Sequence, residues 1–314
     1  MLISKNKISA IIACYKDEQA IPVMYRQLSE TFKKIGCNYE IIFVNDGSPD
    51  NTENVINKII LKDKHVVGIN HSRNFSSQMA FTSGMEICTG DAAVFLDGDL
   101  QDPPKIIEEF YKKWQEGYDV IYGIRTKREA PIYMQILYKF YYRIFHKLSY
   151  VKIPLDAGDF SLIDRKVIDA LKQFPERDRF LRGLRAWVGF KQIGVPYYRP
   201  ERMFGKTTNN LWKNLSWASK GIFSFSYIPL SLMNYLAMAT FIISMFAIVI
   251  EIILRLLNPN IPRGTTTIII VVLFMGSIQL LCISILGEYI GRIFEETKQR
   301  PKYIVKSILK YNDK

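Results

Sequence analysis

Two long apolar runs in the C-terminal third divide this chain into parts that fold in different surroundings. Residues 227–254 and 265–287 carry almost no charge, whereas charged residues are dense before residue 220. A helix needs about 20 apolar residues to cross a bilayer, and both runs exceed that length. The connection at residues 258–264 is too short to cross again. The sequence therefore predicts a head followed by a transmembrane hairpin; the alternative is two buried helices in a water-soluble core.

The positions of the cations predict how the hairpin is oriented. Lys and Arg are frequent on both outer sides of the hairpin, and the connecting region holds only Arg255 and Arg263. Cytoplasmic flanks of membrane spans carry an excess of Lys and Arg, so the head and the C-terminus are predicted to be cytoplasmic. The outer cations are Lys206, Lys213, Lys220, Arg292, Lys298, Arg300, Lys302, Lys306 and Lys310.

These patterns set the expected boundaries of the parts. We expect the head in residues 1–205, an interfacial segment in 206–227, the spans in 228–256 and 265–290, and a basic cytoplasmic tail in 291–314.

One further segment of the head, residues 131–150, is aromatic and basic at helical spacing. Such a helix either lies on a membrane surface or packs on a sheet, and both readings stay open.

The first part of the head alternates between short apolar runs and amphipathic segments. Apolar runs at residues 8–14, 40–44, 66–70 and 92–96 predict strands, and the segments between them have the spacing of helices. Strands and helices that alternate at these lengths form βαβ units. The head is therefore predicted to be an α/β domain with a mostly parallel, doubly wound sheet.

Acidic residues follow three of these predicted strands. Asp17, Asp46 and the pair Asp97 and Asp99 each stand where an apolar run ends. The carboxyl ends of parallel strands meet at one edge of the sheet, which is where ligands of such sheets bind. Carboxylates crowded there repel one another unless a cation or hydrogen-bond donors are present. We therefore expect one cleft that binds a cation and a ligand rich in donors.

The last of these clusters has the composition of a site for a hard cation. Asp97 and Asp99 flank Gly98, and Gln101 follows. Mg²⁺ or Mn²⁺ takes a few protein oxygens and completes its shell from water or a diphosphate. The alternative is a plain turn, because aspartates also bond to their own backbone in turns.

Composition argues against several other classes of site. The net charge of +12 suits an anionic membrane or phosphate-bearing substrates. Zinc-finger spacing and an Arg-rich recognition helix are absent from the sequence, which disfavours nucleic acid as a partner. The four cysteines form no C-x-x-C pair, and three histidines without metal-binding spacing give little support for zinc catalysis.

Residues 97–104, DGDLQDPP, directly after an apolar strand, resemble the signature of family 2 glycosyltransferases. The resemblance is to the branch of dolichyl-phosphate mannose synthases and bacterial polyprenyl-phosphate (bactoprenol) glucosyltransferases. It continues in residues 153–165, with Gly-Asp-Phe at 158–160, and in 276–301, with GEYIGR at 287–292. It implies a GT-A-type nucleotide-sugar-binding sheet domain, here residues 1–205, and a C-terminal two-helix transmembrane hairpin.

The resemblance also implies roles for residues of the donor side. Asp46 would accept a hydrogen bond from the base, and Asp97 would lie near the ribose and the metal. Asp97, Asp99 and Gln101 would hold the Mg²⁺ or Mn²⁺ that bridges the diphosphate. The full set of expected nucleotide contacts is Tyr15, Asp17, Asp46, Arg73 and Asp97.

Other residues are expected to act on phosphate and acceptor. Asp159, in the Gly-Asp-Phe segment, would be the acceptor-side acid, as a base or as an orienting group. Arg125, at the end of a short strand, is a candidate phosphate clamp or a surface cation. Arg202 belongs to a basic loop that would close over the phosphates, and Lys206 would partly replace the usual cation where Thr208 stands.

The implied function is an inverting transfer of a sugar from a nucleotide diphosphate to a polyprenyl phosphate. UDP-glucose is the favoured donor, and undecaprenyl phosphate in the inner (plasma) membrane of a bacterium is the favoured acceptor. The first-strand motif departs from the family at Ala13, Lys16 and Asp17, which leaves the base preference open. Mannose, an amino sugar or aminoarabinose remain alternatives for the sugar, and a glycan or diacylglycerol for the acceptor. A non-enzymatic nucleotide-binding membrane protein is a further alternative. Whether the chain forms a homo-oligomer is left open.

Overall fold

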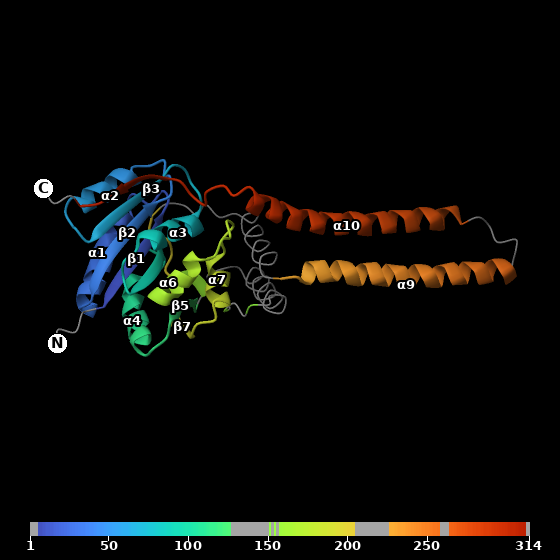
Figure 1. Cartoon of the computed structure of the whole chain (residues 1–314), viewed down its shortest axis with the longest axis horizontal. Coiled ribbons are helices and arrows are strands. Elements are labelled where there is room, and N and C mark those ends of the chain that lie inside the picture. Colours follow the sequence, from blue (N-terminus) through green and yellow to red (C-terminus); the bar gives the residue numbers. More distant parts are fainter. Residues whose placement is uncertain are drawn as a thin grey trace. The chain divides into compact units, whose positions relative to one another are not determined.

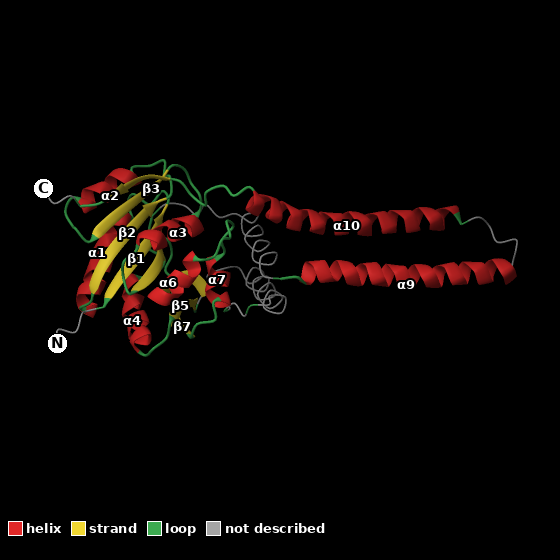
Figure 2. Ribbon diagram, in the orientation of Figure 1, coloured by secondary structure: helices red, strands yellow, loops and turns green. Residues whose placement is uncertain are grey.

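The computed structural model describes residues 6–126, 151, 154, 157–204, 226–257 and 264–311. The chain forms two compact units (Figures 1 and 2). The head comprises residues 1–147, 151–218 and 300–314, and the second unit comprises 148–150 and 219–299. The helix predicted over residues 131–150 and nearly all of the interfacial segment lie outside the described residues.

An eight-stranded sheet organises the head, with the strand order β7-β5-β6-β4-β1-β2-β3-β8. β6 and β8 are antiparallel to their neighbours, and the other pairings are parallel. The predicted mostly parallel α/β sheet is therefore confirmed. The strands are β1 Lys7–Cys14, β2 Asn38–Asn45, β3 Val66–His71, β4 Ala92–Asp97, β5 Val120–Arg125, β6 Ala157–Asp164, β7 Gln192–Tyr197 and β8 Val305–Leu309.

Helices cover the sheet because one stripe of each is apolar. In the first helix, Ile21, Met24, Leu28 and Phe32 recur at helical spacing and are fully buried against the sheet. Gly36 ends this helix in the left-handed conformation, with φ +74°. The helices of the head are α1 Ile21–Ile35, α2 Thr52–Ile60, α3 Ser77–Ile87, α4 Ile107–Gln115 after the short η1 Pro104–Ile106, α6 Arg165–Lys172 and α7 Leu181–Trp187.

The reversed direction of β6 matters for the position of Asp159. β6 is antiparallel to β4 and pairs Ser161 with Phe95. Two residues further along the ladder stand Asp97 on β4 and Asp159 on β6, both at the carboxyl edge of the parallel strands. A strand of the opposite direction would have placed its first residues at the other edge.

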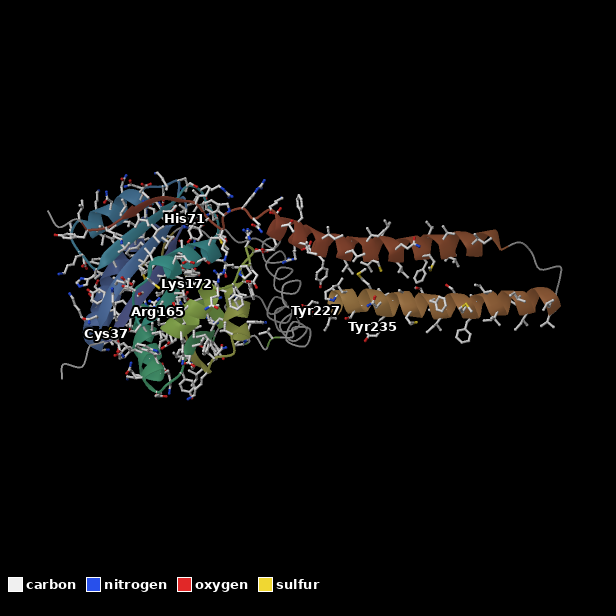
Figure 3. All side chains as sticks on the ribbon, in the orientation of Figure 1. Cys37, His71, Arg165, Lys172, Tyr227 and Tyr235 are labelled. Carbon is white, nitrogen blue, oxygen red and sulfur yellow. The ribbon has the colours of Figure 1, made fainter. Side chains whose placement is uncertain are left out.

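The second unit contains two long apolar helices, α9 Ile228–Leu257 and α10 Thr265–Thr297. Their segments Ile228–Leu254 and Ile270–Thr297 are long and apolar enough to cross a membrane, and their apolar windows are not buried in the structure. Figure 3 shows side chains projecting along both helices, with Tyr235 of α9 labelled. An apolar helix with exposed sides suits a lipid environment rather than a protein core.

The two helices also meet each other. The Tyr289 hydroxyl of α10 donates a 2.8 Å hydrogen bond to the carbonyl of Ser226, just before α9.

A buried carboxylate links neighbouring strands at the edge of the sheet opposite the acidic residues. Glu40 of β2 accepts hydrogen bonds from the Ser9 hydroxyl at 2.6 Å, the Thr89 backbone N–H at 2.6 Å and the Lys7 ammonium at 3.0 Å. Burial alone would raise the pKa of Glu40, but these donors outweigh it, and the pKa is lowered. Glu40 therefore joins β2 to β1 and to the loop before β4.

We predict that Glu40→Gln lowers the free energy of unfolding by about 2 kcal/mol, because bonds to a charged acceptor are lost. A lowered folded-state pKa stabilises the fold above the unfolded-state value and loses this effect as the pH falls through the folded value. The difference between wild type and variant should therefore shrink in acid.

Thermal unfolding of the detergent-solubilised chain at several pH values measures both effects. The control is Glu108→Gln, which removes the exposed pair with Lys34 and should cost well under about 1 kcal/mol. Equal melting shifts for the two variants would contradict the anchoring role of Glu40.

Candidate functional site

The candidate site lies along the carboxyl edge of the sheet, where the ends of six strands bring polar side chains together. β1 and β2 contribute the acids of the predicted nucleotide side, and β4 contributes the Asp97 cluster. β6 contributes Asp159 at its start, and β5 and β7 end in or are followed by arginines. Acids from separate strands thus reach one edge, as the parallel order requires.

The acids after β1 and β2 accept hydrogen bonds from backbone and side-chain donors. Asp17 is buried and accepts a 2.9 Å bond from the Tyr15 N–H. Burial raises the pKa of Asp17 to about 6, with Asp99 adding to the shift and the Tyr15 bond opposing it. Asp46 accepts bonds on Oδ1 from the Phe75 N–H and from Nδ1 of His71, each at 2.8 Å. Both carboxyls are therefore fixed in orientation.

Gly47 allows the chain after β3 to pass close to Asp46. Its φ is +62°, and a Cβ at this position would lie 2.3 Å from the Arg73 carbonyl carbon. Only glycine fits both the conformation and the space. Arg73 itself is exposed, stacks over the Phe75 ring at 4.1 Å and donates to the Asn74 carbonyl. The sequence-predicted Arg73 thus lies beside the turn that carries Asp46.

The turn after β4 is tightly built. A Cβ on Gly98 would lie 2.9 Å from Oδ2 of Asp17, so the glycine allows the two acidic loops to approach. Leu100 is buried with φ +63°, an uncommon conformation for a leucine. Partial burial first, and then the charges of Asp102, Asp99 and Asp159, raise the pKa of Asp97. Its side chain keeps 35% of its surface exposed, so Asp97 faces the open side of this negative cluster.

Two arginines after β7 bind the same turn. Arg202 donates to Oδ2 of Asp99 at 3.1 Å, and Arg199 donates to the amide oxygen of Gln101 at 3.0 Å. Arg199 also lies 4.0 Å from carboxylate oxygens of Asp97 and of Asp99. Arg202 was predicted from sequence, and Arg199 was not. The three candidate metal ligands are therefore in reach of guanidinium groups.

Asp159 forms the best-paired acid of the site. Its two oxygens accept from Nε and Nη2 of Arg182 at 3.0 and 2.9 Å, a two-pronged ion pair. Burial alone would raise the pKa of Asp159, but Arg182, Arg185 and Gln78 outweigh it and the pKa is lowered. Burial lowers the pKa of Arg185 to about 10. Asp159 is thus held as a carboxylate.

Arg125 lies deeper than a surface cation. A Cβ on Gly158 would come within 2.8 Å of its Nη2, so the guanidinium crosses β6 at that glycine. Burial would lower the pKa of Arg125, but Asp102 and Tyr197 raise it. The Tyr197 hydroxyl donates a 2.6 Å bond to buried Asp102. This bond ties the end of β7 to the DGDLQD turn.

Asp97, Asp99 and Gln101 fit a hard divalent cation by chemistry. They offer two carboxylates and one amide oxygen, a set that leaves positions for oxygens of a ligand. Burial and then the neighbouring carboxylates raise the pKa of Asp97, and a bound cation would oppose both effects. Among the described residues no group of three or more Asp, Glu, His or Cys side chains could by itself hold a metal ion.

Sequence reasoning missed Arg182 and Arg199 as members of the site. Arg182 stands in α7 and Arg199 in the loop after β7, and neither position carries a spacing signal. The contacts that these two arginines make become visible only once β6 and β7 are placed beside β4 and β5. Lys206, the remaining predicted site residue, lies outside the described residues.

A family model described as glycosyl transferase family 2 matches residues 9–172, from β1 to α6. An uncharacterized glycosyltransferase of Bacillus subtilis, YkcC, is 41% identical over 95% of this chain and 92% of its own. A prophage bactoprenol glucosyl transferase homolog of Escherichia coli is 37% identical over 97% of this chain and 100% of its own.

Solved structures are more distant. Glucosyl-3-phosphoglycerate synthase from Mycobacterium tuberculosis, in complex with Mn²⁺, UDP and phosphoglyceric acid, matches 69% of this chain and 76% of its own. The TM-score is 0.46 and the identity 17%.

We predict that Gly47→Ala destabilises the chain and displaces the support of Asp46. The new Cβ must move the backbone at Arg73, next to the Phe75 N–H that Asp46 accepts. Gly36→Ala is the matched control, because Gly36 has φ +74° and a Cβ added there would meet no atom within 4 Å. The control carries only the cost of a left-handed conformation for alanine, about 1 kcal/mol.

Thermal unfolding of the full chain, and its binding of UDP, the nucleotide that the family resemblance leads us to expect, measure the two effects. The melting temperature should fall at least twice as far in Gly47→Ala as in the control, and only Gly47→Ala should lose affinity for UDP. Equal behaviour of the two variants would show that the close approach at Gly47 is unimportant.

Proposed function

The chain belongs to glycosyl transferase family 2, and from this premise we propose that it transfers glucose from UDP-glucose to a polyprenyl phosphate. The chain is a glycosyltransferase by its family. The observation that carries the finer proposal is the alternation of carboxylates and arginines along one sheet edge, in a chain with an apolar hairpin. Such an array suits two phosphate-bearing substrates, and the relatives named as bactoprenol glucosyl transferases support a lipid acceptor.

The donor would lie across the ends of β1, β2 and β4. Asp46, whose Oδ1 is bonded to His71, would accept from the base, and Tyr15 and Asp17 would contact the nucleotide from the adjoining loop. Asp97, Asp99 and Gln101 would hold Mg²⁺ or Mn²⁺, which when bound neutralises charge on the departing diphosphate. Arg199 and Arg202 reach the same turn and supply further positive charge to it.

The acceptor phosphate would enter on the side of β5 and β6. Arg125 and Arg182 bring two cations to that side, and both suit phosphate oxygens. A phosphate oxygen attacks the anomeric carbon, the bond from that carbon to the diphosphate breaks, and UDP leaves with the electron pair. The sugar configuration inverts in this single displacement.

Asp159 would orient rather than abstract a proton. Both of its oxygens are taken by Arg182, and its pKa is lowered, so it is a weak base. A phosphate monoester is already anionic at neutral pH, since its second pKa is about 6. The acceptor therefore brings its own nucleophile, and Asp159 holds Arg182 in place.

The hairpin would hold the head at the membrane where the lipid phosphate lies. An isoprenoid keeps its phosphate at the headgroup level, so anchoring the enzyme raises the effective concentration of the two partners. The Lys and Arg flanks favour a cytoplasmic head in the inner membrane of a bacterium. A different sugar on the nucleotide is the nearest alternative, and a panel of nucleotide sugars tests it.

We predict that the purified chain releases UDP from UDP-glucose only when Mg²⁺ or Mn²⁺ and a polyprenyl phosphate are both present. Asp99→Asn should lower kcat/KM by about a hundredfold or more, because an oxygen ligand loses its charge. The control is Asp91→Asn, at the opposite end of β4, where the carboxylate accepts only from the Lys7 N–H among described groups. Full activity of Asp99→Asn, or UDP binding without turnover for every donor and lipid, would overturn the proposal.

A second prediction concerns the pair of Asp159 and Arg182. Asp159→Asn and Arg182→Gln should each lower kcat/KM for the lipid by about 10- to 100-fold, and the double variant should lose little more, because the residues act as a unit. The shape of the pH–rate profile should survive in Asp159→Asn. Additive losses together with a vanished acidic limb would instead identify Asp159 as a general base.

A further inference from the structure

The end of the chain returns to the head after α10. Residues 305–309 form β8, which pairs antiparallel with β3 through Gly68 and Leu309, Ile69 and Ile308, and further pairs up to His71. Figure 1 shows this red segment running beside β3 at the edge of the sheet. The Ser72 N–H also donates to the Ile304 carbonyl at 3.0 Å. The expected basic tail thus contains an ordered strand of the head.

We propose that Tyr303, just before β8, is a positioning residue of the nucleotide site and acts on Asp46 through His71. This inference rests on the proposed function, in which Asp46 receives the base. The part of the ligand that Asp46 would bind is the uracil ring of a uridine nucleotide, which offers an N–H donor to a carboxylate.

His71 is the link between the two residues, and Figure 3 labels it near the end of β3. Tyr303 stacks on the imidazole with ring centroids 5.2 Å apart and planes 14° from parallel. In the imidazole plane, Nδ1 meets Oδ1 of Asp46 at 2.8 Å and Nε2 meets the Ser83 hydroxyl at 2.9 Å. The His71 side chain is fully buried. Two hydrogen bonds therefore fix the ring in its plane, and Tyr303 blocks movement out of it.

The effect on Asp46 is directional. All bonds that Asp46 accepts from described groups fall on Oδ1, from His71 and from the Phe75 N–H. These two donors fix the rotation of the carboxylate and thereby the direction of its other oxygen, Oδ2. A base donor needs that direction to be constant, because hydrogen bonds weaken steeply with misalignment.

A second connection runs from β8 to the same turn. The Asn70 amide donates to the Ser307 hydroxyl of β8 at 3.0 Å, and the Asn45 amide donates to Oδ1 of Asn70 at 3.0 Å. Oδ1 of Asn45 in turn accepts from the Ser48 N–H at 3.0 Å. Asn45 and Asn70 are buried, and this chain of hydrogen bonds joins the C-terminal strand to the turn that carries Asp46.

Hydrogen bonds also fix residues 300–302, which precede Tyr303 in the chain. The Lys302 ammonium donates to the Phe174 carbonyl at 2.8 Å, and Nε of Arg177 donates to the Arg300 carbonyl at 2.8 Å. The stacked ring is therefore placed by contacts on both sides of it. Covering the edge of β3 requires only the backbone hydrogen bonds between β8 and β3. It does not require an aromatic ring whose position is fixed by neighbouring contacts.

The test uses the full chain in detergent with Mn²⁺ and compares Tyr303→Leu with Tyr303→Phe, which keeps the ring. The dissociation constant of UDP reports the whole nucleotide site, and inhibition by inorganic pyrophosphate reports the diphosphate end alone. We expect Tyr303→Leu to weaken UDP about tenfold, the effect of one misaligned hydrogen bond, and pyrophosphate less than about twofold. Tyr303→Phe should match the wild type in both.

Ser307→Ala gives a second test if Tyr303→Leu does not fold, because it removes a hydroxyl without changing the core. It should weaken UDP about threefold and leave pyrophosphate unchanged. The inference would be overturned by wild-type UDP affinity in Tyr303→Leu, or in Ser307→Ala where Tyr303→Leu does not fold. Equal weakening of UDP and pyrophosphate in the same variant would also overturn it. A wild-type chain that binds pyrophosphate but no uridine nucleotide would overturn the proposed function, and the inference with it.

Discussion

Repulsion among carboxylates is the constraint on which the carboxyl edge of this sheet depends. Parallel strands deliver several acids to one place, and that arrangement is unfavourable unless positive charge or donors are supplied. The chain supplies them unevenly. Asp159 is fully matched by Arg182 and has a lowered pKa, whereas Asp97 remains under-compensated and has a raised one. A bound cation would therefore be most favourable at the turn after β4.

This uneven balance separates the two halves of the proposed reaction. Asp159, the acid of the proposed acceptor side, is paired with Arg182 and would hold that arginine toward a phosphate. The acids after β4 lie among arginines whose contacts are partly long, with Arg199 4.0 Å from Asp97 and from Asp99. Arg202 also lies 3.1 Å from Asp99, so guanidinium groups stand at the turn where the proposed diphosphate would bind. In the proposed reaction, one edge would thus serve two anionic substrates with different partners.

Much of this arrangement was predictable from sequence, because it follows from strand direction. Apolar runs that end in Asp17, Asp46 and Asp97 place acids at one edge of any parallel sheet, and the apolar helices are long enough to read directly. Arg182 and Arg199 were not predictable, since a lone arginine in a polar segment looks like any surface cation. Their role appears only when β6 and β7 are set beside β4 and β5.

The two reversed strands explain what periodicity could not reveal. Alternation of apolar and polar residues shows that a segment is a strand but not its direction. Because β6 runs against β4, its first residues, including Asp159, meet the carboxyl edge. Because β8 runs against β3, the residues before its start meet the same edge, and Tyr303 reaches His71. Reversal thus lets segments entering the sheet, as well as segments leaving it, contribute side chains to one site.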